Sequence, residues 1–195
     1  MAKWKRAVAG LALLLAASVS LFALMQGGER QPTASVGGPF QLVDSQKRVV
    51  TDRDFRGHDM LVYFGYTSCP DICPTTLASV IQALNQLGPR GDGIQPIFIT
   101  IDPKRDTPAV IGRYVAAFSP RLIGLTGTAA QIRAVEAAYH VVVRPGVASP
   151  DGLEAIDHSA VLYLMGPDGA FLAPLSPQAS PATLATDLAR FIHAE

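Results

Sequence analysis

The sequence has little charge and only two cysteines. Its 195 residues include 16 basic and 16 acidic side chains, which is 16% of the total, and the formal net charge is zero. No basic stripe runs along any part of the chain, so nucleic acid is a poor candidate partner. Internal repeats are absent as well. The length fits one domain of ordinary size plus a short extra segment.

The N-terminal segment contains no acidic residue. Lys3, Lys5 and Arg6 precede an uncharged run from Ala7 to Met25. A run of roughly 17–25 apolar residues can cross a bilayer as a helix, and its basic flank stays cytoplasmic. No clear A-x-A cleavage site precedes Gln26, and the run is longer than the h-region of a signal peptide, about 7–15 residues. A retained anchor is therefore favoured over a cleaved signal. No cysteine stands directly after the run, which excludes lipid attachment at a lipobox.

The chain is expected to divide into three parts. Residues 1–28 form the membrane anchor (or signal segment), residues 29–38 form a linker rich in Gly, Pro, Ser, Thr and Gln, and residues 39–195 form the folded domain. Three of the 16 basic residues and none of the acidic ones lie in the first part. The exported part thus holds 13 basic against 16 acidic residues and is mildly acidic.

From residue 40 onward, strand-like and helix-like patterns alternate. Continuous apolar runs predict buried central strands, and apolar residues at helical spacing predict helices, with Asp106, Thr128 and Ser180 as N-caps of three of them. The expected strands are 40–43, 49–51, 60–66, 97–101, 122–125, 141–143, 160–165 and 170–172, and the expected helices are 75–87, 106–118, 128–138 and 181–193. This order predicts an α/β fold with a mixed sheet flanked by helices.

The two cysteines stand four positions apart, as Cys69-Pro70-Asp71-Ile72-Cys73, between an expected strand and an expected helix. This placement fits a thioredoxin-like arrangement and suits either dithiol–disulfide exchange or soft-metal binding. A purely structural disulfide is disfavoured because it would close a very short loop. A helix N-terminus lowers a thiol pKa, whereas Asp71 opposes thiolate formation unless a cation compensates. Thioredoxin-type motifs have two residues between the cysteines, and this chain has three, so both chemistries stay open.

A metal site needs a third donor, and His158 is the candidate. It precedes the expected strand 160–165, and in a thioredoxin-like domain that loop faces the cysteine corner. Thiol oxidoreductases of this fold carry a cis-proline there, but no proline lies between Asp157 and Met165. Two thiolates and one imidazole suit Cu(I), whereas structural zinc needs a fourth ligand that is not evident.

Two alternatives at this position stay open: Cu(II) with an added ligand, and a plain loop histidine. Asp157 either orients the imidazole or caps the turn. The remaining histidines are expected to be exposed, capping or structural: His58, His140 and His193.

The stretch from Tyr63 to Pro74, YFGYTSCPDICP, closely resembles the signature of the Sco/SenC family of copper-binding proteins. Segments 101–108 and 157–159 resemble its second and third blocks, and the resemblance spans about residues 37–193. It implies a thioredoxin-like fold behind one membrane anchor, with Cu(I) or Cu(II) as cofactor. The ligands that it implies are Cys69, Cys73 and His158, and the expected supporting residues are Asp71, Asp157, Asp102 and Arg105. For the last two, plain helix capping is the alternative to partner docking or site support.

The resemblance also implies a function: a copper metallochaperone, rather than an enzyme, that assists assembly of the CuA centre of cytochrome c oxidase subunit II. It would be anchored in the inner membrane with its soluble domain in the periplasm. The expected partners are subunit II or a similar copper acceptor, and other periplasmic copper chaperones.

The alternative function is a membrane-anchored thiol–disulfide oxidoreductase that uses Cys69 and Cys73 to reduce the copper-site cysteines of an acceptor. A peroxide-reducing domain is disfavoured because Asp71 stands beside the thiols.

Overall fold

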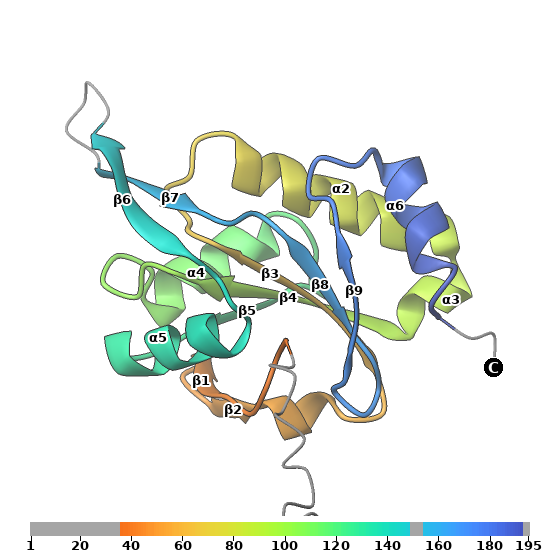
Figure 1. Cartoon of the computed structure of the whole chain (residues 1–195), viewed down its shortest axis with the longest axis horizontal. Coiled ribbons are helices and arrows are strands. Elements are labelled where there is room, and N and C mark those ends of the chain that lie inside the picture. Colours follow the sequence, from red (N-terminus) through yellow and green to blue (C-terminus); the bar gives the residue numbers. More distant parts are fainter. Residues whose placement is uncertain (1–35, 149–153, 193–195) are drawn as a thin grey trace, which may run out of the picture. The chain divides into compact units, whose positions relative to one another are not determined.

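The computed structural model describes residues 36–148 and 154–192 of the chain, within the compact unit Ser35–Glu195 (Figure 1). The expected anchor over residues 1–28, most of the expected linker and His193 lie outside the described residues. Within the described ranges, no helix is both long enough and apolar enough to cross a membrane. The membrane anchor thus stays a prediction.

A seven-stranded sheet forms the centre of the domain. Its strands are β1 Gln41–Asp44, β2 Val49–Thr51, β3 Asp59–Gly65, β4 Ile94–Thr100, β5 Ile123–Thr126, β8 Leu162–Met165 and β9 Phe171–Leu175. They lie in the order β2-β1-β5-β4-β3-β8-β9. β3, β4 and β5 are parallel to one another, and the other pairings are antiparallel. The predicted mixed sheet is confirmed, with the two longest apolar runs, β3 and β4, paired near its middle.

Helices cover both faces of this sheet (Figure 1). They are α2 Ile72–Leu87, α3 Pro89–Asp92, α4 Pro108–Ala116, α5 Ala129–Ala138 and α6 Pro181–Leu188, with a 3-10 turn, η1, at Asp52–Phe55. Successive residues of a strand point to opposite faces. In β3, Leu61 and Tyr63 pack with α2, α4 and α6, whereas Val62 and Phe64 pack with α5. The core is therefore two apolar layers, in which each fully buried large side chain contributes about 1.5–3 kcal/mol.

Two of the three expected helix caps are confirmed. The Thr128 hydroxyl accepts a hydrogen bond from the Gln131 N–H, and the Gln131 side chain accepts one from the Thr128 N–H, so α5 begins with a reciprocal capping box. The Ser180 hydroxyl caps α6 by accepting from the Thr183 N–H at 3.1 Å. Such caps stabilise a helix by about 0.5–2 kcal/mol.

The third expected cap is wrong. The N-cap of α4 is Thr107, in an extended conformation, and Pro108 is the first helical residue. Asp106 is instead completely buried, and its carboxylate accepts hydrogen bonds from Thr67 and Thr100. A buried carboxylate needs such donors, so long-range bonding takes precedence over local capping at this position.

A separate two-stranded sheet carries the candidate histidine. β6 Val143–Ala148 and β7 Glu154–His158 pair antiparallel, with Val143 opposite His158. The expected short strand at 141–143 and the expected loop around His158 are therefore wrong, because His158 ends a strand. β8 also begins at Leu162 rather than at residue 160. Figure 1 shows this hairpin at the end of the sheet where β3 leads into α2.

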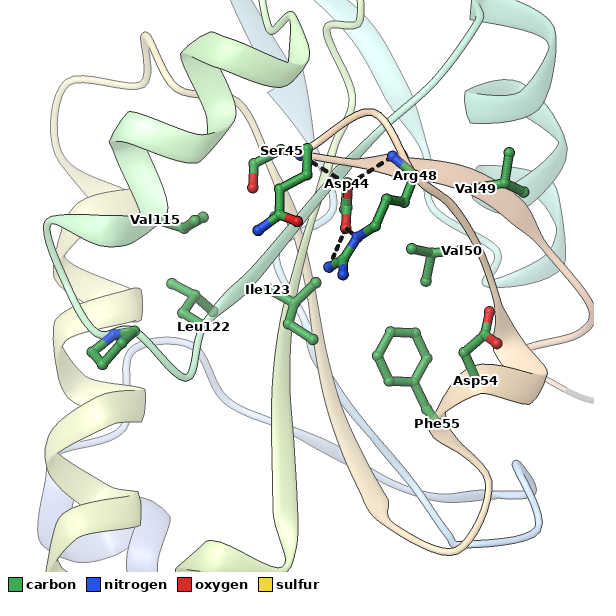
Figure 2. Close-up of a pocket in the computed structure, with 13 residues that line it drawn as sticks. Asp44, Ser45, Arg48, Val49, Val50, Asp54, Phe55, Val115, Leu122 and Ile123 are labelled. Atoms are coloured by element: carbon green, nitrogen blue, oxygen red, sulfur yellow. Dashed lines mark hydrogen bonds and ion pairs between the residues drawn. The ribbon is translucent and has the colours of Figure 1, made fainter.

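A hollow of about 480 Å³ lies at the turn between β1 and β2, beside the start of β5 (Figure 2). The Asp44 carboxylate there accepts hydrogen bonds from the N–H groups of Gln46 and Arg48 and from the Arg48 guanidinium. Burial raises the pKa of Asp44, but these hydrogen bonds outweigh burial and lower it. β3 and β5 are parallel, so the start of β5 is remote from the cysteines at the end of β3, and no cysteine lines the hollow.

Candidate metal centre

The cysteine loop joins the end of β3 to the start of α2. At Gly65, the last residue of β3, an added Cβ atom would lie 2.9 Å from the Cys73 sulfur and 2.8 Å from the Phe98 ring. Glycine thus lets the sulfur approach the strand. α2 begins at Ile72 with the exposed Asp71 as its N-cap, so Cys73 is the second helical residue. The predicted strand-to-helix corner is confirmed.

The two thiols are adjacent but differ in exposure. Cys73 is completely buried, whereas Cys69 is only partly buried, and both are free thiols. The Cys73 backbone N–H lies 3.5 Å from the Cys69 sulfur and donates to it. This contact places Cys69 at the N-terminal end of α2, where the helix dipole favours negative charge. Cys69 is therefore the sulfur that an incoming group reaches first.

The environment of Cys73 opposes its ionisation. Burial raises the pKa of the Cys73 thiol to about 12, a hydrogen bond with the Tyr66 backbone acts in the opposite direction, and the adjacent Cys69 adds to the increase. At Cys73, burial therefore outweighs the acidification expected at a helix N-terminus. A cysteine binds a metal as the thiolate, so the metal has to replace the proton of Cys73.

The His158 imidazole has a ring nitrogen available for a metal. Its Nδ1 lies 3.2 Å from the Ser159 carbonyl oxygen, to which it donates, so Nε2 keeps its lone pair. Burial lowers the pKa of the half-buried imidazole, although the Ser159 carbonyl and the charge of Asp157 raise it, and the ring is neutral at pH 7. The Ser159 carbonyl holds the ring, whereas the exposed Asp157 acts on it through charge.

Tyr66 connects the cysteine loop to the histidine hairpin. Its ring meets the His158 ring edge-on, with the ring centroids 6.1 Å apart and an interplanar angle of 76°. Its hydroxyl accepts a hydrogen bond from the Ile156 N–H at 3.4 Å, and its backbone carbonyl accepts one from the Cys69 N–H at 3.2 Å. Tyr66 therefore contacts both the cysteine loop and the hairpin that carries His158. In the sequence, Tyr66 is only one position of the motif around the cysteines, and nothing there indicates this role.

The three predicted ligands are near one another but not assembled. Within residues 36–148 and 154–192, no three His, Cys, Asp or Glu side chains are grouped closely enough to hold a metal ion. The structure brings Cys69 and Cys73 together and places His158 against Tyr66, which contacts Cys69. The ligand set therefore stays a prediction. His58 is exposed, as expected, whereas His140, for which a structural role was expected, is exposed as well.

Asp102 and Arg105 contact the centre through Tyr66. The Arg105 guanidinium donates to the buried Asp102 carboxylate, and its central carbon lies 6.0 Å from the centroid of the Tyr66 ring. A cation over an aromatic ring contributes about 0.5–1 kcal/mol at a partly exposed site. This contact supports the expected role of the pair in holding the site, while partner docking stays a prediction.

Asp106 connects the cysteine loop to β4, a role that was not predicted from the sequence. Its carboxylate accepts from the Thr67 N–H at 3.0 Å, from the Thr67 hydroxyl at 2.5 Å and from the Thr100 hydroxyl at 2.6 Å. Thr67 stands two residues before Cys69. The only signal in the sequence is the position of Asp106 shortly after β4, in a segment whose Asp, Thr and Pro also fit helix capping.

The fold and the site define a class of protein: a thioredoxin-like domain with two free thiols at a strand-to-helix corner and an imidazole close by. The chain belongs to the SCO1/SenC family, whose model matches residues 28–193. The mitochondrial SCO2 homologue of Bos taurus is 48% identical over 141 residues, which are 71% of this chain and 53% of that protein. This chain spans about half the length of the mitochondrial relatives that it matches.

Solved structures of the same family support the fold and the metal. ScoI of Bradyrhizobium japonicum, solved with copper bound, is 42% identical, with a TM-score of 0.73 over 80% of this chain and 99% of that one. BsSco, described as a member of the Sco family of cytochrome c oxidase assembly proteins, is 22% identical, with a TM-score of 0.66 over 84% of this chain and 94% of its own. The thioredoxin-like fold is confirmed. Copper is the metal bound in the solved structures of ScoI from Bradyrhizobium japonicum, ScoI from Arabidopsis thaliana and yeast Sco1.

Proposed function

We propose that this chain is a copper metallochaperone that binds copper through Cys69, Cys73 and His158. The observation that carries the proposal is the pairing of two adjacent free thiols with a neutral imidazole at one corner of the domain. Two soft thiolates and one imidazole are a donor set for Cu(I), and they accept Cu(II) as well. Copper in ScoI of Bradyrhizobium japonicum supports this choice of metal.

Loading begins at Cys69, the less buried of the two cysteines. Cys69 is the accessible thiol, and Cys73 follows as the metal replaces its proton. His158 then has to approach the sulfurs, because the three donors are not grouped in the present arrangement. In this proposal the hairpin that ends in His158 makes the approach. The contacts of Tyr66 with the His158 ring and the Ile156 N–H change as it moves.

Release proceeds by ligand exchange. Three ligands leave Cu(I) open to a further thiolate, so an acceptor sulfur forms a copper–sulfur bond while the bond to Cys69 breaks. The proton lost by the acceptor thiol is taken up by the freed Cys69 sulfur, and the oxidation state of copper does not change. We propose the CuA centre of cytochrome c oxidase subunit II as the acceptor, in keeping with the description of BsSco as a Sco-family assembly protein.

The proposed location places the domain beside such an acceptor. Residues 1–28 would anchor the chain in the inner membrane, with the domain in the periplasm. Other periplasmic copper chaperones would supply the metal. The uncharged run from Ala7 to Met25 behind a basic flank supports this arrangement.

The test counts copper bound per chain after anaerobic loading with Cu(I). We expect one equivalent in the wild type, none after Cys69→Ala or Cys73→Ala, and an affinity lowered about tenfold or more after His158→Ala. His58→Ala is the matched control, because His58 is exposed and remote from the thiols. Unchanged copper in all three site variants would contradict the proposal.

Thiol–disulfide exchange is the weaker candidate. It needs a ready thiolate, but burial opposes ionisation of Cys73. It also gives His158 no role, whereas the imidazole is held in the tautomer of a metal ligand. Full copper-free reduction of an oxidised acceptor by the His158→Ala variant would favour exchange over copper delivery.

A further inference from the structure

A tyrosine hydroxyl lies behind the buried cysteine. Tyr63, in β3, is 1% exposed and Cys73 is 0% exposed. The Tyr63 hydroxyl lies 3.8 Å from the Cys73 sulfur, to which it donates a hydrogen bond. Cys73 is therefore contacted from the core by a fixed proton donor, on the side of the sulfur away from solvent.

Packing alone does not explain the Tyr63 hydroxyl. The Tyr63 ring lies against Phe98, with the centroids 6.3 Å apart, and a phenylalanine would fill the same space. A buried hydroxyl without a partner costs about 1–3 kcal/mol, and the bond to Cys73 avoids this cost at Tyr63. The Thr76 side chain is a second hydrogen-bond neighbour of Tyr63, but an ionised or metal-bound sulfur is the stronger acceptor because it carries negative charge.

A second tyrosine with a buried hydroxyl, Tyr114, serves as a comparison because this hydroxyl makes no hydrogen bond among the described residues. Tyr114 packs on the same Phe98 ring, with the centroids 5.4 Å apart. Burial raises the pKa of Tyr114, and its side chain packs against the core cluster that contains Cys73. Within the described part of the chain, however, it has no hydrogen-bond partner. The two tyrosines thus share a neighbour and a core layer and differ in the bond to Cys73.

We propose that Tyr63 is a positioning residue whose hydrogen bond holds the Cys73 sulfur and favours the reduced thiol and Cu(I) over the disulfide and Cu(II). A hydrogen bond withdraws electron density from a thiolate, and Cu(II) needs that density more than Cu(I) does. Oxidation to the disulfide removes the free Cys73 thiol that accepts this bond, so the bond favours the reduced pair. The copper part of this inference rests on the proposed copper site, whereas the part that concerns the dithiol does not.

The first measurement is made without metal. The purified chain is equilibrated with mixtures of glutathione and glutathione disulfide, so that two electrons and two protons pass from Cys69 and Cys73 to glutathione disulfide, which becomes two glutathiones. In Tyr63→Phe, we expect the equilibrium to shift about three- to tenfold toward the protein disulfide, as fits the loss of one hydrogen bond. Tyr114→Phe is the matched control, and we expect it to equal the wild type.

The second measurement compares copper affinities by competition with Cu(I) and Cu(II) chelators. We expect the ratio of Cu(I) to Cu(II) affinity to fall about three- to tenfold in Tyr63→Phe and to stay unchanged in Tyr114→Phe. Equal behaviour of the two variants in both measurements would overturn the proposal. A shifted dithiol equilibrium in a chain that binds no copper would support the action of Tyr63 on the sulfur and would contradict the copper function.

Discussion

Removing the Asp106 carboxylate is expected to destabilise the fold and loosen the cysteine loop at the same time. In Asp106→Ala, the Thr67 N–H, the Thr67 hydroxyl and the Thr100 hydroxyl all lose their acceptor. Hydrogen bonds to charged groups contribute about 1.5–3 kcal/mol each. The two hydroxyls can rotate toward other acceptors, but the N–H cannot, so we expect a loss of about 3–5 kcal/mol in the free energy of unfolding.

Thermal unfolding measures this loss. A change of 1 kcal/mol shifts Tm by about 2–4 °C in a chain of this size, so we expect Tm to fall by about 6–20 °C. Copper binding should weaken as well, because Thr67 stands two residues before Cys69. Asp54→Ala is the matched control: the exposed Asp54 accepts the same pair of bonds, from the N–H and the hydroxyl of Thr51. Equal, small shifts in the two variants would refute the reasoning.

Two further perturbations test other parts of the structure. The pKa of Asp44 is lowered in the fold, so its stabilising effect is complete above the unfolded value of about 3.9 and is lost as the pH falls through the folded value. The gap in Tm between wild type and Asp44→Asn should therefore close as the pH falls below about 4, and a constant gap in a pH series of melts would contradict this. Gly65→Ala places a Cβ atom against the Cys73 sulfur and the Phe98 ring, so we expect a loss of about 1–3 kcal/mol and reduced copper binding. Gly93→Ala, whose Cβ would meet nothing closer than 3.7 Å, should leave copper binding intact.

The strands and helix starts that depend on neighbouring residues could be predicted from the sequence. The apolar runs at 61–64 and 97–101 predicted the paired strands β3 and β4, and the capping residues Thr128 and Ser180 marked the starts of α5 and α6. The cysteine corner followed from the same patterns, because a buried strand ends and a helix begins around the two thiols.

Long-range contacts account for what the sequence did not reveal. Pro145 and Gly146 lie within β6 and are residue types that are rare in strands, so the hairpin carries a weak strand signal. The antiparallel pairing that holds His158 is visible only in three dimensions. Asp106 fits a helix cap when it is considered alone, yet its partners come from the cysteine loop and the end of β4. Alternation predicts that Tyr63 is buried, but nothing local indicates that its hydroxyl meets Cys73.

The most direct test of the copper site is X-ray absorption spectroscopy of the chain loaded with one Cu(I). The account predicts two sulfur ligands and one imidazole nitrogen, with the nitrogen absent in His158→Ala and kept in His58→Ala. A copper centre with sulfur ligands alone, and the same spectrum in wild type and His158→Ala, would contradict it.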